Sequence, residues 1–186
     1  FDAARLTDAT IRVLLASLAG LFPGVGAIAE HDLDRLEPMT RSAVRYAKQV
    51  DITEHFMRLA TINAEVRALA RYWDRFDILL TPATAVPPPP HKTLPMTESD
   101  LDAFLTRLFA ISPFTAPFNA SGQPAIVLPV HRTPDGLPVG AQFVARLAED
   151  GLLLRLAAQI ERVAGPWPAA QPVPVARTHA ASQGAR

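Results

Sequence analysis

Cysteine is absent from the 186 residues of this chain. Without thiols there is no disulfide framework, no thiolate zinc site and no cysteine nucleophile. The absence of disulfides fits a reducing compartment, and we expect a cytoplasmic location. A run of about 18 unbroken apolar residues, the length that spans a bilayer, is missing too. The nearest stretch, Ile11–Ile28, is interrupted by Arg12, Pro23 and glycines, so we expect no membrane association.

An excess of positive charge is also lacking. The 18 Lys and Arg residues balance 18 Asp and Glu residues, and the formal net charge is zero. Nucleic-acid-binding proteins normally gather a basic excess on one face, so we expect no nucleic-acid partner. With 49% hydrophobic and 19% charged residues, the composition is that of a globular protein with a real core and about one domain.

The local signatures of several common active sites do not occur. There is no Gly-x-Ser-x-Gly elbow, no His-Glu-x-x-His pair and no glycine-rich phosphate loop. Ser121 is the serine nearest to a nucleophile pattern, but a small hydroxyl beside Gly122 is common in turns, and we interpret the pair as the turn before a strand. The acidic cluster around His31 is better explained as a helix start than as a metal site. Lys48 is expected in solvent, and we assign no catalytic and no metal-binding residue.

The spacing of apolar residues predicts several helices. The first lies near the start of the chain, is capped by Thr7 or Asp8 and ends at Gly20. The second covers Thr40–Gln49. The third begins at a capping box, 51–54, in which Asp51 accepts from a free amide and Glu54 reaches back. Its predicted apolar stripe is Phe56, Leu59, Ile62, Val66, Leu69 and Trp73, and its polar face is Arg58, Glu65, Arg67 and Arg71.

Three apolar runs bounded by turn residues predict strands. Residues 77–82 have the pattern of a buried strand rather than an edge strand. Residues 125–130 and 139–144 flank a turn in which Gly136 can take positive φ, which predicts a hairpin-like reversal. Further helices are predicted from Thr97 or Ser99 to Phe109 and over 152–163. Helices that alternate with buried strands predict the α/β class, with fewer strands than such a sheet usually has.

Three blocks of sequence carry a resemblance. They are Asp77–Ala83, the Asn-x-Ser-Gly-Gln-Pro-Ala block at 119–125 and the Asp-Gly-Leu-Pro-x-Gly-x-Gln block at 135–142. Their order and spacing over Leu36–Trp167 resemble the carboxy-terminal portion of the amidase signature family. The resemblance implies part of a mixed β-sheet flanked by helices, an incomplete amidase-signature fold. It also implies cleavage of carboxylic amides without a metal or organic cofactor.

The catalytic unit that the resemblance implies is a serine nucleophile, a second serine on a cis peptide and a lysine base. In the family these residues precede the part that resembles this chain, and no Gly-Ser-Ser-Gly-like run occurs in residues 1–186. The first residue, Phe1, is not methionine. We therefore expect 1–168 to be the carboxy-terminal part of an amidase domain, 169–186 to be a flexible tail, and the isolated chain to be inactive without its missing amino-terminal amidase segment.

Four residues are expected, from the resemblance, to form the acyl side of a substrate pocket: Ser112, Phe114, Thr115 and Asn119. Relatives that make glutaminyl-tRNA carry an aspartate where Ser112 aligns, to hold the substrate's amino group. Serine there, with the neutral net charge, argues against an amidotransferase acting on charged tRNA and favours a less polar acyl group.

Two interpretations from different classes follow. The first is the carboxy-terminal portion of an amidase whose substrate is a small-molecule amide. The alternative is a non-catalytic, partner-binding half of a split or degenerate amidase-like protein. That alternative predicts a large apolar face where missing strands would dock, and a homodimer or aggregation of the isolated chain.

Overall fold

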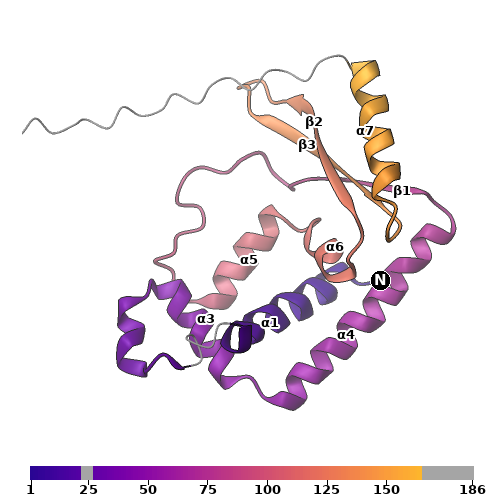
Figure 1. The fold of residues 1–186 in the computed structure, drawn as a ribbon. Coiled ribbons are helices and arrows are strands. Elements are labelled where there is room, and N and C mark those ends of the chain that lie inside the picture. The colour runs from indigo at the N-terminus through magenta and orange to yellow at the C-terminus, as the bar shows by residue number, and fades with distance from the viewer. Residues whose placement is uncertain (22–26, 165–186) are drawn as a thin grey trace, which may run out of the picture.

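A computed structural model describes residues 1–21 and 27–164 of the chain. Most of the helices form one body, and the strands with the last helix rise from it (Figure 1). The helical elements are α1 (Ala3–Leu21), η1 (Glu30–Arg35), α3 (Pro38–Gln49), α4 (Ile52–Ala70), η2 (Arg71–Asp74), α5 (Leu101–Ile111), α6 (Ala116–Ser121) and α7 (Asp150–Ala164). The strands are β1 (Ile78–Pro82), β2 (Ala125–Arg132) and β3 (Pro138–Ala145). The expected tail at 169–186 lies outside the described residues.

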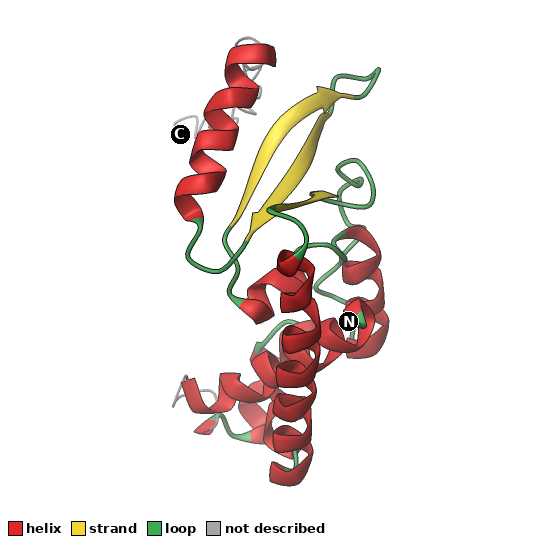
Figure 2. Ribbon diagram, turned by 90° about the vertical axis from the view of Figure 1, so that its right-hand side faces the viewer, coloured by secondary structure: helices red, strands yellow, loops and turns green. Residues whose placement is uncertain are grey.

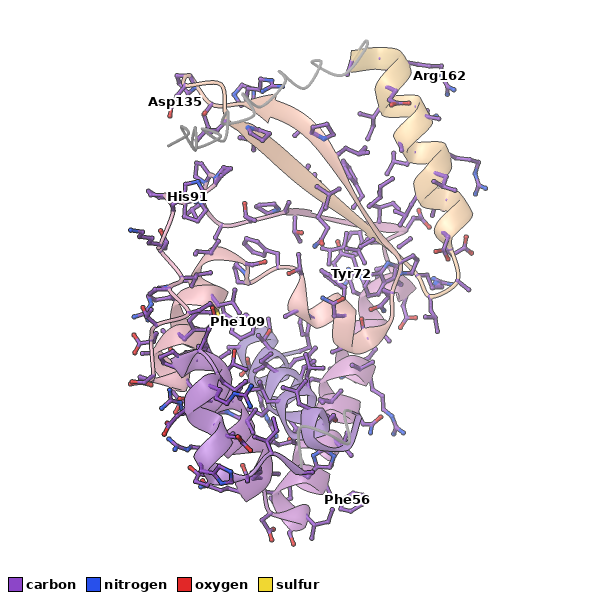
Figure 3. All side chains as sticks on the ribbon, turned by 60° about the vertical axis from the view of Figure 1, so that its left-hand side comes forward. Phe56, Tyr72, His91, Phe109, Asp135 and Arg162 are labelled. Atoms are coloured by element: carbon purple, nitrogen blue, oxygen red, sulfur yellow. The ribbon has the colours of Figure 1, made fainter. Side chains whose placement is uncertain are left out.

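The described strands form one sheet in the order β1-β3-β2, with both pairs antiparallel. β2 and β3 make the predicted hairpin, and Gly136 in its turn has a φ of 85°, which a glycine adopts without strain. Figure 3 shows Asp135 at the tip of this hairpin. The α/β class expected from the sequence is confirmed.

The expectation that residues 77–82 form a buried rather than an edge strand is wrong for the part of the chain that the structure describes. β1 pairs only with β3 and lies at one edge of the sheet. Leu80 is 60% exposed. Its neighbours across the sheet, Phe143 of β3 and then Ile126 of β2, lie on one side of β1 only, so its other side is open. Leu79 points the other way and packs against the core.

The core joins the helices to the sheet. Buried side chains from α4, η2, α6 and β3 form one cluster, with Tyr72 and Leu79 packed against it: Leu69, Trp73, Phe118 and Val144. Tyr72 marks this junction in Figure 3. Val144 and Ala145 are both fully buried, and because adjacent strand residues point to opposite faces, the sheet is covered on both sides there. α7 packs along β2 and β3 and buries Leu153 (Figure 2).

The first helix begins earlier than predicted. α1 starts at Ala3, and the side chain that caps it is Asp2, whose carboxylate accepts the N–H of Arg5 at 3.0 Å. Thr7 and Asp8 therefore lie inside the helix. The predicted cap of α4 is confirmed for Asp51, which accepts the N–H groups of Thr53 and Glu54 at 2.8 and 3.2 Å. The Glu54 side chain instead pairs with Arg58, four residues on.

The predicted faces of α4 are partly wrong. Phe56, placed on the apolar stripe, is 63% exposed, and Figure 3 shows it at the end of the helical body away from the sheet. Glu65, placed on the polar face, is buried. The reason is that α1 packs beside α4 and brings two donors to the Glu65 carboxylate: the N–H of Asp2 at 2.8 Å and the Arg5 guanidinium at 3.5 Å.

Candidate functional site

The structure brings three of the four predicted pocket residues together. Ser112 follows α5, Thr115 precedes α6 and Asn119 lies within α6. The hydroxyl oxygens of Ser112 and Thr115 are 3.0 Å apart, and Asn119 Nδ2 donates to the Thr115 carbonyl at 3.3 Å. The short connection between the two helices therefore presents two hydroxyls and an amide in one place.

The helix α6 that carries Asn119 is short and strongly terminated. Pro117 stands in its first turn, where a missing N–H is not needed. Gly122 ends it in the left-handed conformation with φ 74°, and its N–H returns to the Phe118 carbonyl at 2.9 Å. No helix was expected here. Ser121 is its last residue and its hydroxyl hydrogen-bonds Gln123 Oε1, which agrees with a turn before β2.

A cavity of about 440 Å³ lies between α1 and the α5–α6 segment. Its lining is Thr7, Thr10, Ile11, Leu14, Leu108, Phe109, Ser112, Thr115, Ala116 and Asn119. The four residues from α1 were not predicted. The sequence signals them only through the helical spacing of apolar residues, which shows that α1 has a packing face but not what that face meets.

Phe114, the fourth predicted residue, does not line this cavity. Its carbonyl accepts a hydrogen bond from Gln142 Nε2 at 3.1 Å. The same nitrogen donates to Thr81 Oγ1 at 3.0 Å, so one amide group connects β3, β1 and the loop between α5 and α6. Gln142 is 3% exposed. The position of the Ser112–Thr115 turn is thus set from the sheet by a buried side chain.

The polar groups of the cavity suit an uncharged ligand. A serine and a threonine hydroxyl that share one hydrogen bond keep one proton free to donate, and the Asn119 amide keeps unused donors and acceptors. None of the lining residues, all within the described part, carries a charge. Through residues 1–21 and 27–164, no hydrogen bond joins a serine hydroxyl to a histidine or lysine side chain, so the pocket holds hydrogen-bonding groups rather than a nucleophile–base pair.

The other candidates from the sequence occupy structural positions. The acidic cluster forms η1, where Glu30 pairs with Arg45 at 2.6 Å and Asp34 with Arg41 at 2.7 Å. Lys48 is exposed and donates to the Ile28 carbonyl. Among the described residues, no group of three His, Asp or Glu side chains could hold a metal ion. Nor does any helix in that part combine the length and apolar character needed to cross a membrane.

Charged residues hold α1 in place beside the cavity. Arg12 donates to Asp8 at 2.9 Å and to Asp102 of α5 at 2.6 Å, and its guanidinium lies 5.5 Å from the centre of the Tyr46 ring. Burial opposes the charge of this guanidinium, but hydrogen bonds to Asp102 and Asp8 raise the pKa of Arg12 above its ordinary value. Arg12, Asp8 and Asp102 border a second groove, of about 470 Å³, that shares Thr7, Ile11 and Phe109 with the cavity.

The family model for Amidase matches residues 28–154, so the chain belongs to the amidase family. Its similarity to the 6-aminohexanoate-cyclic-dimer hydrolase of Paenarthrobacter ureafaciens is 40% identity over 108 residues, or 55% of this chain and 22% of that protein. The enzyme of the same name from Pseudomonas sp. is 41% identical over 108 residues, with the same coverage.

Solved structures agree with this assignment. The structure of 6-aminohexanoate cyclic dimer hydrolase complexed with substrate superposes with a TM-score of 0.72 at 31% identity, over 92% of this chain and 37% of that one. A bacterial aryl acylamidase of the amidase signature enzymes shares the fold, with a TM-score of 0.68 at 19% identity over 93% of this chain and 37% of its own. The chain spans between a fifth and two fifths of the length of these relatives. α1 lies outside the residues that the family model matches.

Proposed function

We propose that this chain provides the scaffold and acyl-pocket wall of an amidase that hydrolyses the C–N bond of a carboxylic amide. In this proposal the Ser–cis-Ser–Lys unit lies outside the 186 residues. The observation that carries the proposal is the cavity at Ser112 and Thr115, which offers hydrogen bonds to a substrate in a chain of the amidase family but contains no nucleophile–base pair among the described residues.

The serines of the chain support this division of roles. There are six, none adjacent to another in sequence: Ser17, Ser42, Ser99, Ser112, Ser121 and Ser182. None of them stands in a Gly-Ser-Ser-Gly-like run, the kind of segment that carries the catalytic unit in the family. The relatives, moreover, are several times longer than the segment that matches this chain. The expected domain role of 1–168 as the carboxy-terminal part of an amidase domain is retained in the proposal.

The uncharged lining supports a neutral amide as substrate. Moving an ionised group from water into a site that offers no opposite charge costs roughly several kcal/mol. A neutral amide needs only hydrogen bonds there. Thr115, Asn119 and the Ser112 hydroxyl offer those bonds. The proposed substrate class is therefore a small-molecule carboxylic amide with an uncharged acyl group.

Hydrolysis assays test the proposal. The purified 186-residue chain is assayed with a panel of small aryl amides, alone and after co-expression with the region encoded directly upstream. Release of the aryl amine only in the co-expressed sample is the expected result. Hydrolysis by the chain alone would contradict the proposal, because a serine within these residues would then be the nucleophile.

A second function, a non-catalytic half that binds a partner, is favoured by one observation. Large apolar side chains are exposed at the β1 edge and around α7: Phe76, Leu80, Leu147, Leu154 and Val163. An open strand edge with apolar neighbours is a pairing surface. This alternative predicts a homodimer of the isolated chain, which sedimentation equilibrium would detect, and no hydrolysis after co-expression.

A further inference from the structure

One wall of the cavity comes from a helix that the family match does not include. The segment from α5 to α6 supplies the hydroxyl pair and part of the apolar lining, within residues 28–154. The opposite wall is α1, which contributes Thr7, Thr10, Ile11 and Leu14. The two walls differ in chemistry: α1 contributes the aliphatic side chains of Ile11 and Leu14, and its Thr10 hydroxyl already donates to the Leu6 carbonyl of the same helix at 2.7 Å.

We infer that α1 is the specificity-determining wall of the acyl pocket, and that Leu14 sets the length of uncharged acyl chain that the pocket accepts. This inference rests on the proposed function and names the selectivity of the same site. The apolar part of the acyl group lies against Ile11, Leu14 and Phe109. The hydroxyl pair of Ser112 and Thr115 donates its free proton to an acceptor of the ligand.

The charged side chains near the cavity lie outside its lining, and each already has a partner. Arg12, Asp8 and Asp102 border the neighbouring groove, and each has a partner among the other two or in Arg58. A carboxylate or ammonium group on the acyl chain would therefore have to leave water without a counter-charge. The pocket accordingly discriminates against charged analogues of the same length.

Leu14 can control the length of acyl chain that the pocket accepts without affecting the stability of the fold. Its side chain is 52% exposed at the edge of the cavity, so a change of its size alters the pocket more than the core. The position of α1 is fixed elsewhere, by Arg12 on Asp102 and by Arg58 of α4 on Asp8. Substitutions at Leu14 should therefore leave the helix where it is.

Ligand binding to the ¹⁵N-labelled 186-residue chain tests the inference without requiring catalysis. Hexanamide is titrated as the uncharged probe, with 6-aminohexanamide as its charged analogue and octanamide as a longer one. We expect amide shifts at residues 7–14 and 112–119 with hexanamide, and binding of the charged analogue weaker by about tenfold or more. Equal binding of both hexyl probes, or shifts confined to other residues, would overturn the inference.

Two variants give opposite changes that misfolding would not produce. Leu14→Trp is expected to weaken hexanamide binding by about tenfold, the equivalent of losing one well-buried apolar contact. Leu14→Ala is expected to improve octanamide relative to hexanamide. Met57→Trp on α4, at a residue 67% exposed and outside the cavity lining, is the matched control and should bind as the unaltered chain does.

The outcomes separate this inference from the proposed function. Selective binding that depends on Leu14, with no hydrolysis after co-expression, supports the role of α1 and contradicts the amidase proposal. Hydrolysis after co-expression with binding that is indifferent to both Leu14 variants overturns the role of α1 alone.

Discussion

The two walls of the cavity are anchored by different chemistry. The wall at Ser112–Asn119 is tied to the sheet by Gln142, a buried amide that makes neutral hydrogen bonds to Phe114 and Thr81. The α1 wall is tied to its neighbours by ion pairs nearer the surface, Arg12 with Asp102 and Asp8 with Arg58.

This difference predicts how each wall responds to change. A buried hydrogen bond is costly to break because its partner is left without water, and salt does not screen it. Exposed or half-buried ion pairs contribute about 0–1 kcal/mol and weaken with ionic strength. The first wall should therefore be rigid, and the second should tolerate substitution, which suits a wall that sets specificity.

The largest expected effect is at Gln142. Gln142→Ala leaves the Phe114 carbonyl and the Thr81 hydroxyl without their donor and opens a small cavity beside Val144. We expect the free energy of unfolding to fall by about 2–4 kcal/mol, measured by urea denaturation. Gln142→Met has nearly the same length, lacks the amide donors and adds no charge, so a comparable loss would assign the effect to the hydrogen bonds rather than to the cavity. The exposed Gln159 of α7, changed to Ala, is the control, and a loss at Gln142 no larger than at Gln159 would contradict the anchoring role.

A smaller loss is expected at Gly140, on the same sheet. A Cβ there would lie 2.8 Å from Val127 Cγ1 and 3.1 Å from Ala83 Cβ, closer than side chains tolerate. Gly140→Ala should cost about 1–3 kcal/mol through overpacking, and Val127→Ala in the same chain should recover part of it. Gly151→Ala in α7 is the matched control. Its nearest neighbour is the flexible end of Arg155 at 3.4 Å, so this change should instead stabilise by up to about 1 kcal/mol. Equal losses at both glycines would show that close packing at Gly140 is not the cause.

The wall at Ser112–Asn119 was also easier to predict from the sequence than the α1 wall. Strand patterns, the turn at Gly136 and the motif residues around Asn119 are local signals, and the structure places Ser112, Thr115 and Asn119 in one short segment. The α1 wall depends on which helix packs against which, and apolar spacing alone carries no such information. Glu65 shows the same limit, because the donors that make its burial possible come from residues 2 and 5, about 60 positions earlier in the chain. The edge position of β1 was not predicted, because an apolar run does not indicate how many strands pair with it.

The smallest expected loss of stability is at Arg58, and it tests most directly whether ion pairs hold the α1 wall. Arg58 donates to Glu54 on its own helix at 2.6 Å and to Asp8 of α1 at 3.0 Å, and Arg58→Met keeps most of the apolar stem while removing both bonds. We expect a loss of about 1 kcal/mol at low salt, because Asp8 retains Arg12 as a partner. The loss should shrink in 1 M NaCl, roughly a 3 Å screening length, whereas the loss at Gln142 should not. Arg67→Met on the same helix, at an exposed arginine without an ion pair among the described residues, should change stability little at either salt concentration. If the Arg58 loss is as large as the Gln142 loss and insensitive to salt, α1 is held by a buried contact, and the contrast between a rigid and an adjustable wall does not hold.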